Sequence, residues 1–303
     1  MQVLRTPDER FTGLAGWPHE PRWLEWQGLR VHYVDAGPAD GPVVLLIHGE
    51  PTWSYMWRGL IARLTAAGWR CVAYDHVGFG RSDKPADDAW YTIARHEAVA
   101  RHVIETLDLR EITLLVHDWG GPIGLRQAVD LPERFARLVA LNTWLHHEGM
   151  RYGDGWRQWR ELATGFAPPD GDLPCGDVLT LARARPIEDA AALKAAYDAP
   201  FPDPSYKAGA RRFPWLLPWA QPVEGDAAGQ QRCHEALLRW DRTPIHLVWP
   251  EVDPIFELSW GEAWAAMLPG ATFDVIPSTS HFLAEEAPDE LADVLLGRMA
   301  GRR

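Results

Sequence analysis

The chain has 303 residues, 47% of them hydrophobic, which is enough for one large α/β domain with an insertion or for two modest domains. Its formal net charge of -12 and its lack of Lys/Arg runs argue against a nucleic-acid partner. Three widely spaced cysteines, a start without an apolar signal segment and the absence of a membrane-length apolar run favour a cytoplasmic protein with no membrane partner.

Strand patterns open the chain, and helical and strand patterns then alternate. Glycine and proline clusters separate the first strands from one another. The predicted strands cover residues 22–26, 29–35, 43–47, 70–74, 114–117, 138–142, 245–249 and 272–276, and the predicted helices cover 57–67, 93–107, 262–268 and 288–299. This alternation predicts an α/β fold with a mostly parallel sheet and helices on both faces.

The composition and the secondary-structure pattern of the sequence change between residues 145 and 225. Trp, Pro and Gly are frequent there, helical stretches are short and no convincing strand pattern occurs. We interpret residues 1–144 and 226–303 as one α/β core domain and residues 145–225 as a helical cap domain inserted into it.

Asp118 occupies the most informative position of the chain, between an apolar strand pattern and a helical pattern that starts at Pro122. A strand that turns directly into a helix, with two glycines close behind a polar residue, has the form of a nucleophile elbow. A carboxylate that attacks a saturated carbon forms an ester that can later be hydrolysed, and it needs no general base because it is ionised at neutral pH. The elbow therefore predicts displacement of a leaving group from an sp³ carbon, with a simple helix N-cap as the alternative.

Asp253 and His281 each follow one of the two strands predicted near the C-terminal end. Side chains at the carboxyl ends of parallel strands meet at one edge of the sheet. The chain order nucleophile, acid, histidine is that of α/β-hydrolases. We predict a catalytic triad of Asp118, Asp253 and His281, with Glu148 as a less favoured acid.

The turn after the strand at 43–47 also faces the predicted elbow. It can direct a backbone N–H towards the nucleophile, which predicts an oxyanion hole made by the N–H groups of Glu50 and Trp119. His281, oriented by Asp253, would then deprotonate the water that attacks the ester.

Six segments match a known family, and three of them lie outside the catalytic motifs. They are LRTPDERF at 4–11, HGEPTWSY at 48–55, GFGRSDKP at 78–85, DWGG at 118–121, YDAPFPD at 197–203 and SYKAG at 205–209. On these segments the chain resembles, nearly end to end, the haloalkane dehalogenases of the subfamily whose second halide-binding residue is a cap tryptophan.

The resemblance implies an α/β-hydrolase that uses water to convert a small haloalkane into an alcohol, a halide ion and a proton, without a metal or organic cofactor. It implies that Trp119 and, by position in the cap, Trp159 bind the halide through their indole N–H groups. The residues it implies for the substrate pocket are Trp156, Phe213, Pro214 and Ile255. We expect a monomer or a weak homodimer.

Two departures from the family pattern leave alternatives open. His117 replaces the glutamine expected before the nucleophile, and a His-Asp-Trp-Gly-Gly elbow is also typical of epoxide hydrolases. Such an enzyme would use the same triad and would need cap tyrosines, for which Tyr152, Tyr197 and Tyr206 are available. The segment between Trp159 and Tyr197, which contains residues 168–171, is longer and more polar than expected, which predicts an altered tunnel and pocket shape. A non-catalytic binding protein on this fold is a further alternative.

Overall fold

The strands of the core form one sheet in the computed structural model, which describes residues 1–166 and 171–300. They are β2 (Arg22–Trp26), β3 (Leu29–Ala36), β4 (Val43–Ile47), β5 (Arg70–Tyr74), β7 (Ile112–Asp118), β8 (Phe135–Thr143), β9 (Ile245–Pro250) and β10 (Thr272–Ile276). Their spatial order is β10-β9-β8-β7-β4-β5-β3-β2. All neighbours from β10 to β5 pair in parallel, and β3 and β2 add an antiparallel edge. The predicted mostly parallel sheet is confirmed.

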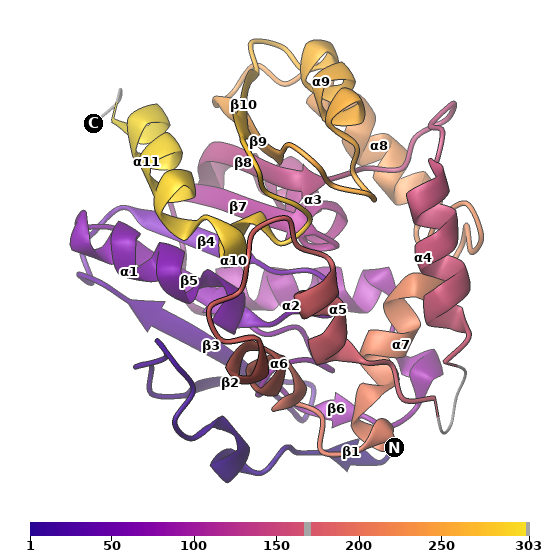
Figure 1. The fold of residues 1–303 in the computed structure, drawn as a ribbon. Helices are drawn as coiled ribbons and strands as arrows, with labels where there is room; N and C mark the ends of the chain where they lie inside the picture. Colours follow the sequence, from indigo (N-terminus) through magenta and orange to yellow (C-terminus); the bar gives the residue numbers. More distant parts are fainter. Residues whose placement is uncertain (167–170, 301–303) are drawn as a thin grey trace.

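Helices pack on both faces of the sheet, as Figure 1 shows. The helices of the core are α1 (Arg58–Ala66), α2 (Ile93–Thr106), α3 (Gly120–Asp130), α8 (Ala227–Leu237), α9 (Leu258–Met267), α10 (Leu283–Glu286) and α11 (Pro288–Met299). Residues of α2, α3, α8 and α9 join the apolar core of one face, whereas residues of α1, α10 and α11 join the core of the other.

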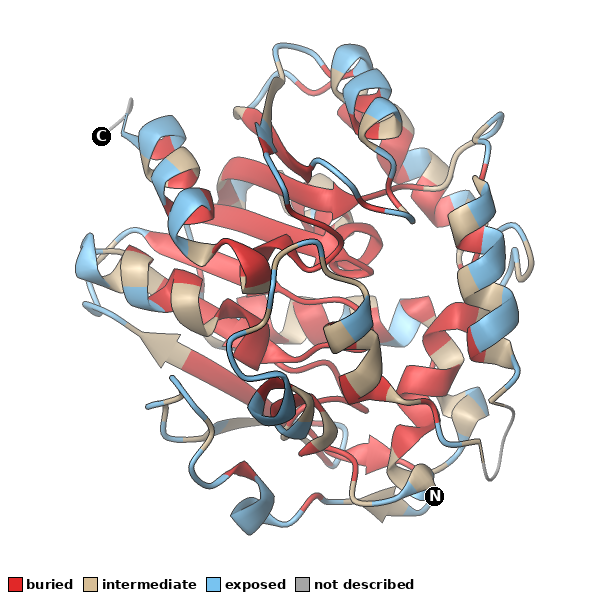
Figure 2. Ribbon diagram, in the orientation of Figure 1, coloured by how far each residue is buried: buried red, intermediate tan, exposed pale blue. Residues whose placement is uncertain are grey.

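Strand β4 shows why the sheet is buried on both sides. Successive side chains of a strand point to opposite faces, and all five residues of β4 are apolar and buried. Leu45 and Ile47 join one core, while Val44 and Leu46 join the other. Figure 2 shows the same layering, with buried strands inside and exposed outer helix faces. A continuous apolar run is the pattern expected for a central parallel strand.

Residues 145–225 contain helices and, among the described residues, no strand. The helices are α4 (Asp154–Thr164), α5 (Cys175–Leu181), α6 (Ala190–Asp198) and α7 (Ala208–Trp215). In Figure 1 α4 and α7 lie side by side, and so do α5 and α6. Within the segment between Trp159 and Tyr197, residues 167–170 lie outside the described residues, and the predicted effect of the segment on a tunnel and on pocket shape stays a prediction.

Two short strands, β1 (Val3–Leu4) and β6 (Lys84–Pro85), pair antiparallel away from the main sheet. No helix in the described part of the chain is long and apolar enough to cross a lipid bilayer.

Candidate active site

Asp118 is the last residue of β7, and α3 begins two residues later. Its backbone adopts the left-handed conformation, with φ of 50°, which turns the chain sharply from strand to helix. Gly120 makes this turn possible, since a Cβ there would lie 2.2 Å from the backbone oxygen of Ile47 on the neighbouring strand. Thr143 Oγ1 donates to the Asp118 carbonyl oxygen at 2.5 Å and fixes the turn from β8. The structure therefore has the strand–turn–helix geometry of an elbow.

Two backbone N–H groups bind the Asp118 carboxylate. Glu50 N donates to Asp118 Oδ2 at 2.8 Å, and the backbone N–H of Trp119 also hydrogen-bonds the carboxylate. The approach is close enough that a Cβ on Gly49 would lie 2.4 Å from Asp118 Oδ2. Burial raises the pKa of Asp118 above its ordinary value, although His281 and the two N–H donors oppose this shift. Both N–H groups predicted for the oxyanion hole thus lie at the Asp118 carboxylate.

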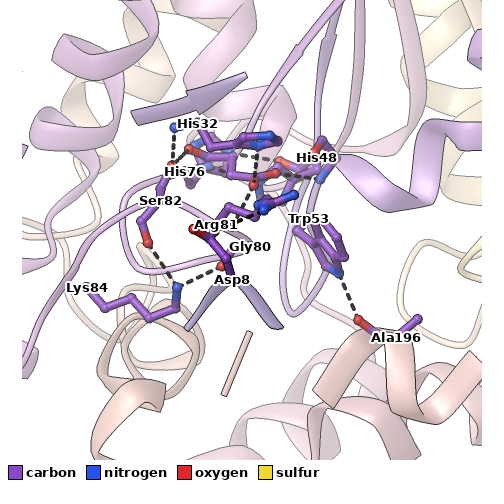
Figure 3. Close-up of polar contacts among 12 residues, drawn as sticks. Asp8, His32, His48, Trp53, His76, Gly80, Arg81, Ser82, Lys84 and Ala196 are labelled. Carbon is purple, nitrogen blue, oxygen red and sulfur yellow. Dashed lines mark hydrogen bonds and ion pairs between the residues drawn. The ribbon is translucent and has the colours of Figure 1, made fainter. Parts of the chain in front are cut away.

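Two buried histidines, His48 and His76, hold the turn that carries the Glu50 N–H through hydrogen bonds (Figure 3). His48 Nδ1 donates to Gly49 O at 2.8 Å, while His48 Nε2 accepts the His76 backbone N–H at 3.0 Å. His76 Nε2 in turn donates to His48 O at 2.9 Å. Burial lowers the pKa of His48 to about 4 and that of His76 well below its ordinary value. Both rings are therefore neutral near pH 7, which gives each ring the single donor that this pairing uses.

Beside these histidines, the Asp75 carboxylate fixes the loop that follows β5. It accepts hydrogen bonds from His32 Nδ1 and from the backbone N–H groups of Ser54 and Arg81, each at 2.8 Å. Figure 3 also shows Trp53, whose indole N–H donates at 3.2 Å to the backbone oxygen of Ala196 on α6. The segment around the oxyanion turn is thus tied to both the core and the cap.

His281 lies opposite Asp118 and is oriented by Asp253. His281 Nδ1 is 3.0 Å from Asp253 Oδ2, and Asp253 Oδ1 accepts Ile255 N at 2.7 Å and Phe256 N at 3.1 Å. Burial alone lowers the pKa of His281, but the Asp253 and Asp118 carboxylates outweigh it and the pKa is raised. Burial raises the pKa of Asp253, but the adjacent imidazole and the hydrogen bonds outweigh it and the pKa is lowered. The pair favours an ionised Asp253 that orients the ring.

Asn142 and His117 support this pair, and neither role was predicted from the sequence. Asn142 Nδ2 donates at 2.7 Å both to Asp253 Oδ2 and to the backbone oxygen of His281. His117 Nε2 donates to the same backbone oxygen at 2.9 Å. Burial lowers the pKa of His117 to about 3, with the His281 charge acting in the same direction, so His117 is neutral and serves as a donor. The alternative acid Glu148 is exposed and its backbone N–H donates to a side chain of α8.

The Asp118 carboxylate and His281 face a cavity of about 370 Å³. Its described lining comes from two parts of the chain. Residues outside 145–225 are Glu50, Asp118, Trp119, Pro254, Ile255, His281 and Phe282, and residues within 145–225 are Gly155, Trp156, Gln158, Trp159, Leu162, Val178, Leu181, Ala182, Pro214 and Leu217. Leu162 and Leu181 are 59% and 82% exposed although they line it, so they mark its opening between α4 and α5. The predicted residues Trp156, Pro214 and Ile255 are all on the wall.

Phe213 is the exception among the predicted pocket residues. It is fully buried and stacks on the far side of Trp119, with ring centroids 5.0 Å apart, and on His96 at 4.7 Å. The reason is the helical phase of α7, in which neighbouring residues point about 100° apart. Pro214 on α7 and Leu217, which follows the helix, line the cavity instead.

Three indole groups at the cavity have an N–H without a partner among the described residues: those of Trp119, Trp156 and Trp159. Trp156 and Trp159 lie one turn apart on α4 and both line the cavity. Trp156 is buried and packs edge-on against Trp144 at 4.8 Å and Phe256 at 4.8 Å, whereas Trp159 is half-buried. Both are therefore placed to offer a second donor beside Trp119.

The cap tyrosines face away from this site. Tyr152 pairs with His146 Nδ1 at 2.8 Å, Tyr197 donates to Glu285 at 2.7 Å, and no tyrosine is among the described residues that line the cavity. An epoxide hydrolase would need a tyrosine at the cavity as the acid that protonates the epoxide oxygen. Within the described residues, no group of three or more His, Cys, Asp or Glu side chains is placed to hold a metal ion.

Comparisons with known proteins agree with this geometry. The alpha/beta hydrolase fold family matches residues 42–171. The haloalkane dehalogenase of Mycobacterium marinum is 40% identical over 306 residues, covering 98% of this chain and 99% of that protein. The haloalkane dehalogenase of Psychrobacter cryohalolentis is 39% identical over 98% of this chain and 97% of that protein. Among solved structures, the tetrameric haloalkane dehalogenase DpaA from Paraglaciecola agarilytica NO2 has a TM-score of 0.89, 31% identity and 97% of each chain covered.

Proposed function

The chain belongs to the haloalkane dehalogenases, and we propose how its own residues hydrolyse a haloalkane to an alcohol, a halide ion and a proton. One observation carries the proposal: the buried carboxylate of Asp118 faces a mostly apolar cavity and is held by the Glu50 N–H at 2.8 Å. A carboxylate that is aimed into an apolar cavity is suited to attack a neutral alkyl substrate.

In the first step Asp118 attacks the carbon that bears the halogen. A carbon–oxygen bond forms, the carbon–halogen bond breaks, and the halogen leaves with the bonding electron pair. The departing halide accepts hydrogen bonds but offers none, so donors without acceptors suit it. The indole N–H groups of Trp119 and Trp159 supply such donors in a site that excludes most water, where they act most strongly.

In the second step His281 removes a proton from water, and the water oxygen attacks the carboxyl carbon of the Asp118 ester. His281 Nδ1 is engaged by Asp253 at 3.0 Å, which leaves Nε2 to act as the base. The N–H groups of Glu50 and Trp119 stabilise the oxyanion of the tetrahedral intermediate. When the intermediate collapses, the alkoxide leaves and takes the proton held by His281, which releases the alcohol and returns His281 to its neutral form. The remaining proton of the water leaves the carboxyl group of Asp118 for solvent, and the carboxylate is restored.

The size and the lining of the cavity favour a small substrate and a cap domain that covers the cavity. A volume of about 370 Å³ is at the lower end of the range for small-molecule pockets. We propose that residues 145–225 act as this cap domain, since α4, α5 and α7 contribute most of the wall opposite Asp118. The expected monomer or weak homodimer is tested by light scattering of the purified protein.

Halide and proton release from 1,2-dibromoethane and 1-bromobutane tests the proposed function, with styrene oxide consumption measured alongside. We expect halide release by the native protein and none by Asp118→Asn, a variant that keeps the side-chain shape but loses the nucleophilic carboxylate. Halide release that persists in Asp118→Asn would remove the nucleophile assignment. Diol formation from the epoxide without halide release would instead favour the epoxide hydrolase alternative.

A further inference from the structure

A buried carboxylate outside the triad connects the catalytic histidine to the cap. Glu286 is the last residue of α10, five residues after His281, and is only 8% exposed. Its Oε1 accepts the backbone N–H of Ser280, the residue before His281, at 2.9 Å. Its Oε2 accepts the backbone N–H groups of Ala184 and Arg185, each at 2.9 Å. One carboxylate thus binds three backbone donors from two segments far apart in sequence.

The second of these segments is also part of the cavity wall. We call residues 181–185, which run from the last residue of α5 towards α6, the cap strap. Residues 277–281 are the His281 loop. Leu181 and Ala182 of the cap strap line the cavity. Figure 1 shows the connection from α5 to α6 passing beside α10. The contacts of Glu286 therefore join a wall of the substrate cavity to the loop that carries the base.

Arg185 gives the cap strap a second attachment to the same loop. Its guanidinium donates to Ser278 O at 3.2 Å and to Pro277 O at 3.0 Å, and it pairs with Glu290 of α11 at 2.7 Å. These contacts are more exposed than those of Glu286, because the Arg185 and Glu290 side chains are 27% and 52% exposed. The buried Glu286 contacts are consequently the stronger attachment.

We propose that Glu286 is a positioning residue for ester hydrolysis, which clamps the cap strap to the His281 loop and so holds His281 where it activates water. The inference rests on the proposed role of His281 as the base. Asp118 attacks without assistance from His281. Loss of the clamp therefore slows ester hydrolysis and leaves ester formation nearly unchanged.

The charge of Glu286 also acts on His281 itself. The charged or titratable groups around the imidazole are Asp253 after β9, Asp118 and His117 on β7, and Glu286 on α10. Burial lowers the pKa of His281, whereas Asp253, Asp118 and, after them, Glu286 raise it. Removal of the Glu286 charge lowers this pKa, so more of the base is neutral in acid. The acid limb of ester hydrolysis then moves to lower pH.

Glu285 provides a matched control on the same helix. Its side chain is 3% exposed and binds Arg58 through both oxygens, and it accepts the Tyr197 hydroxyl at 2.7 Å. It contacts neither the His281 loop nor the cap strap within the described residues. Glu285→Gln therefore removes another carboxylate charge of the same helix without affecting the proposed clamp.

The test follows the formation and decay of the alkyl-enzyme with 1-bromobutane by rapid quench and intact mass. In Glu286→Gln we expect ester hydrolysis about tenfold slower, below the roughly hundredfold cost of a 1 Å misplacement, and ester formation within about twofold of native. The acid limb of hydrolysis should move to lower pH. In Glu285→Gln both rates and the acid limb should stay at native values.

Glu286→Asp separates the two effects and covers a failure of Glu286→Gln to fold. It keeps the charge but its shorter side chain cannot hold both segments, so hydrolysis should slow while the acid limb stays in place. Equal slowing in Glu285→Gln and Glu286→Gln, or equal slowing of formation and hydrolysis, would overturn the inference.

The reference variant is His281→Phe. If His281→Phe accumulates the alkyl-enzyme while Glu286→Gln does not, the inference about Glu286 is wrong and the proposed function stands. If no variant forms an alkyl-enzyme at all, the proposed function itself fails.

Discussion

Replacement of Asn142 with alanine tests how the base and its acid are held together. The Asn142 amide donates two hydrogen bonds of 2.7 Å, to the Asp253 carboxylate and to His281 O. A charge-assisted bond contributes about 1.5–3 kcal/mol and a neutral one about 0.5–1.5 kcal/mol. The variant also removes Asn142 Oδ1, a buried oxygen without a partner among the described residues. Removal of this unsatisfied acceptor stabilises the fold by about 1 kcal/mol. We expect a net loss of about 2 kcal/mol in the free energy of unfolding.

The same change should act on one kinetic step. Asp253 loses a hydrogen bond that lowers its pKa, and His281 loses one of two donors to its backbone oxygen. If the full 2 kcal/mol is expressed in the transition state, ester hydrolysis slows about thirtyfold while ester formation is unaffected. Rapid quench with 1-bromobutane measures both rates, and urea unfolding followed by tryptophan fluorescence measures stability.

Gln127→Ala is the matched control for this experiment. Gln127 is 1% exposed, its Nε2 donates to two backbone oxygens at 3.2 Å, and its Oε1 likewise has no partner among the described residues. It lies on α3 and has no contact with the triad. Its removal should lower stability without slowing ester hydrolysis. Similar hydrolysis rates in the two variants would refute the reasoning about Asn142.

Three further predictions concern the halide site, acid stability and the elbow. Trp159→Phe should weaken halide binding about tenfold or more, measured as loss of halide-dependent fluorescence quenching; a larger loss in Trp156→Phe would move the second donor one turn along α4. Burial lowers the pKa of His96 to about 3, so only the unfolded chain binds its proton between pH 6.5 and 3, and stability falls as the pH drops through this window. His96→Phe should therefore shrink the stability difference between pH 7 and 5 by about 2 kcal/mol in urea titrations, and an unchanged difference would contradict it. Gly120→Ala, whose Cβ would lie 2.2 Å from Ile47 O, should lower the free energy of unfolding by about 3 kcal/mol or more. Gly297→Ala in α11, whose Cβ meets nothing within 4 Å, is the control and should raise the free energy of unfolding by about 0.5–1 kcal/mol. Equal unfolding midpoints of the two variants would contradict the elbow packing.

The sequence predicts those parts of the site that depend on local pattern. Asp118 is recognisable because the strand, the turn and the helix around it are consecutive in the chain. The bounds predicted for β2, β4, β5, β10 and α11 agree with the structure, since each has a clear apolar period or a flanking turn. The α8 helix was not predicted, because its sequence has few large apolar residues.

The supporting contacts depend on pairs that are far apart in sequence. Asn142 and Asp253 are 111 residues apart, and Glu286 joins Ser280 to Ala184 of the cap strap across about a hundred residues of sequence. No local period indicates such partners. The wrong placement of Phe213 in the pocket has a different origin. Phe213 and Pro214 are adjacent on α7 and point about 100° apart, and it is Pro214 that lines the cavity.

The central claim is that an alkyl ester forms on Asp118 and that His281 is needed to hydrolyse it. Intact mass spectrometry of His281→Phe after incubation with 1-bromobutane tests this claim most directly, with Asp118→Asn as the companion sample. The account predicts that His281→Phe gains the mass of one butyl group in place of a proton, that peptide mapping locates it on Asp118, and that Asp118→Asn gains nothing. An unmodified His281→Phe protein, or a butyl group on another residue, would contradict it.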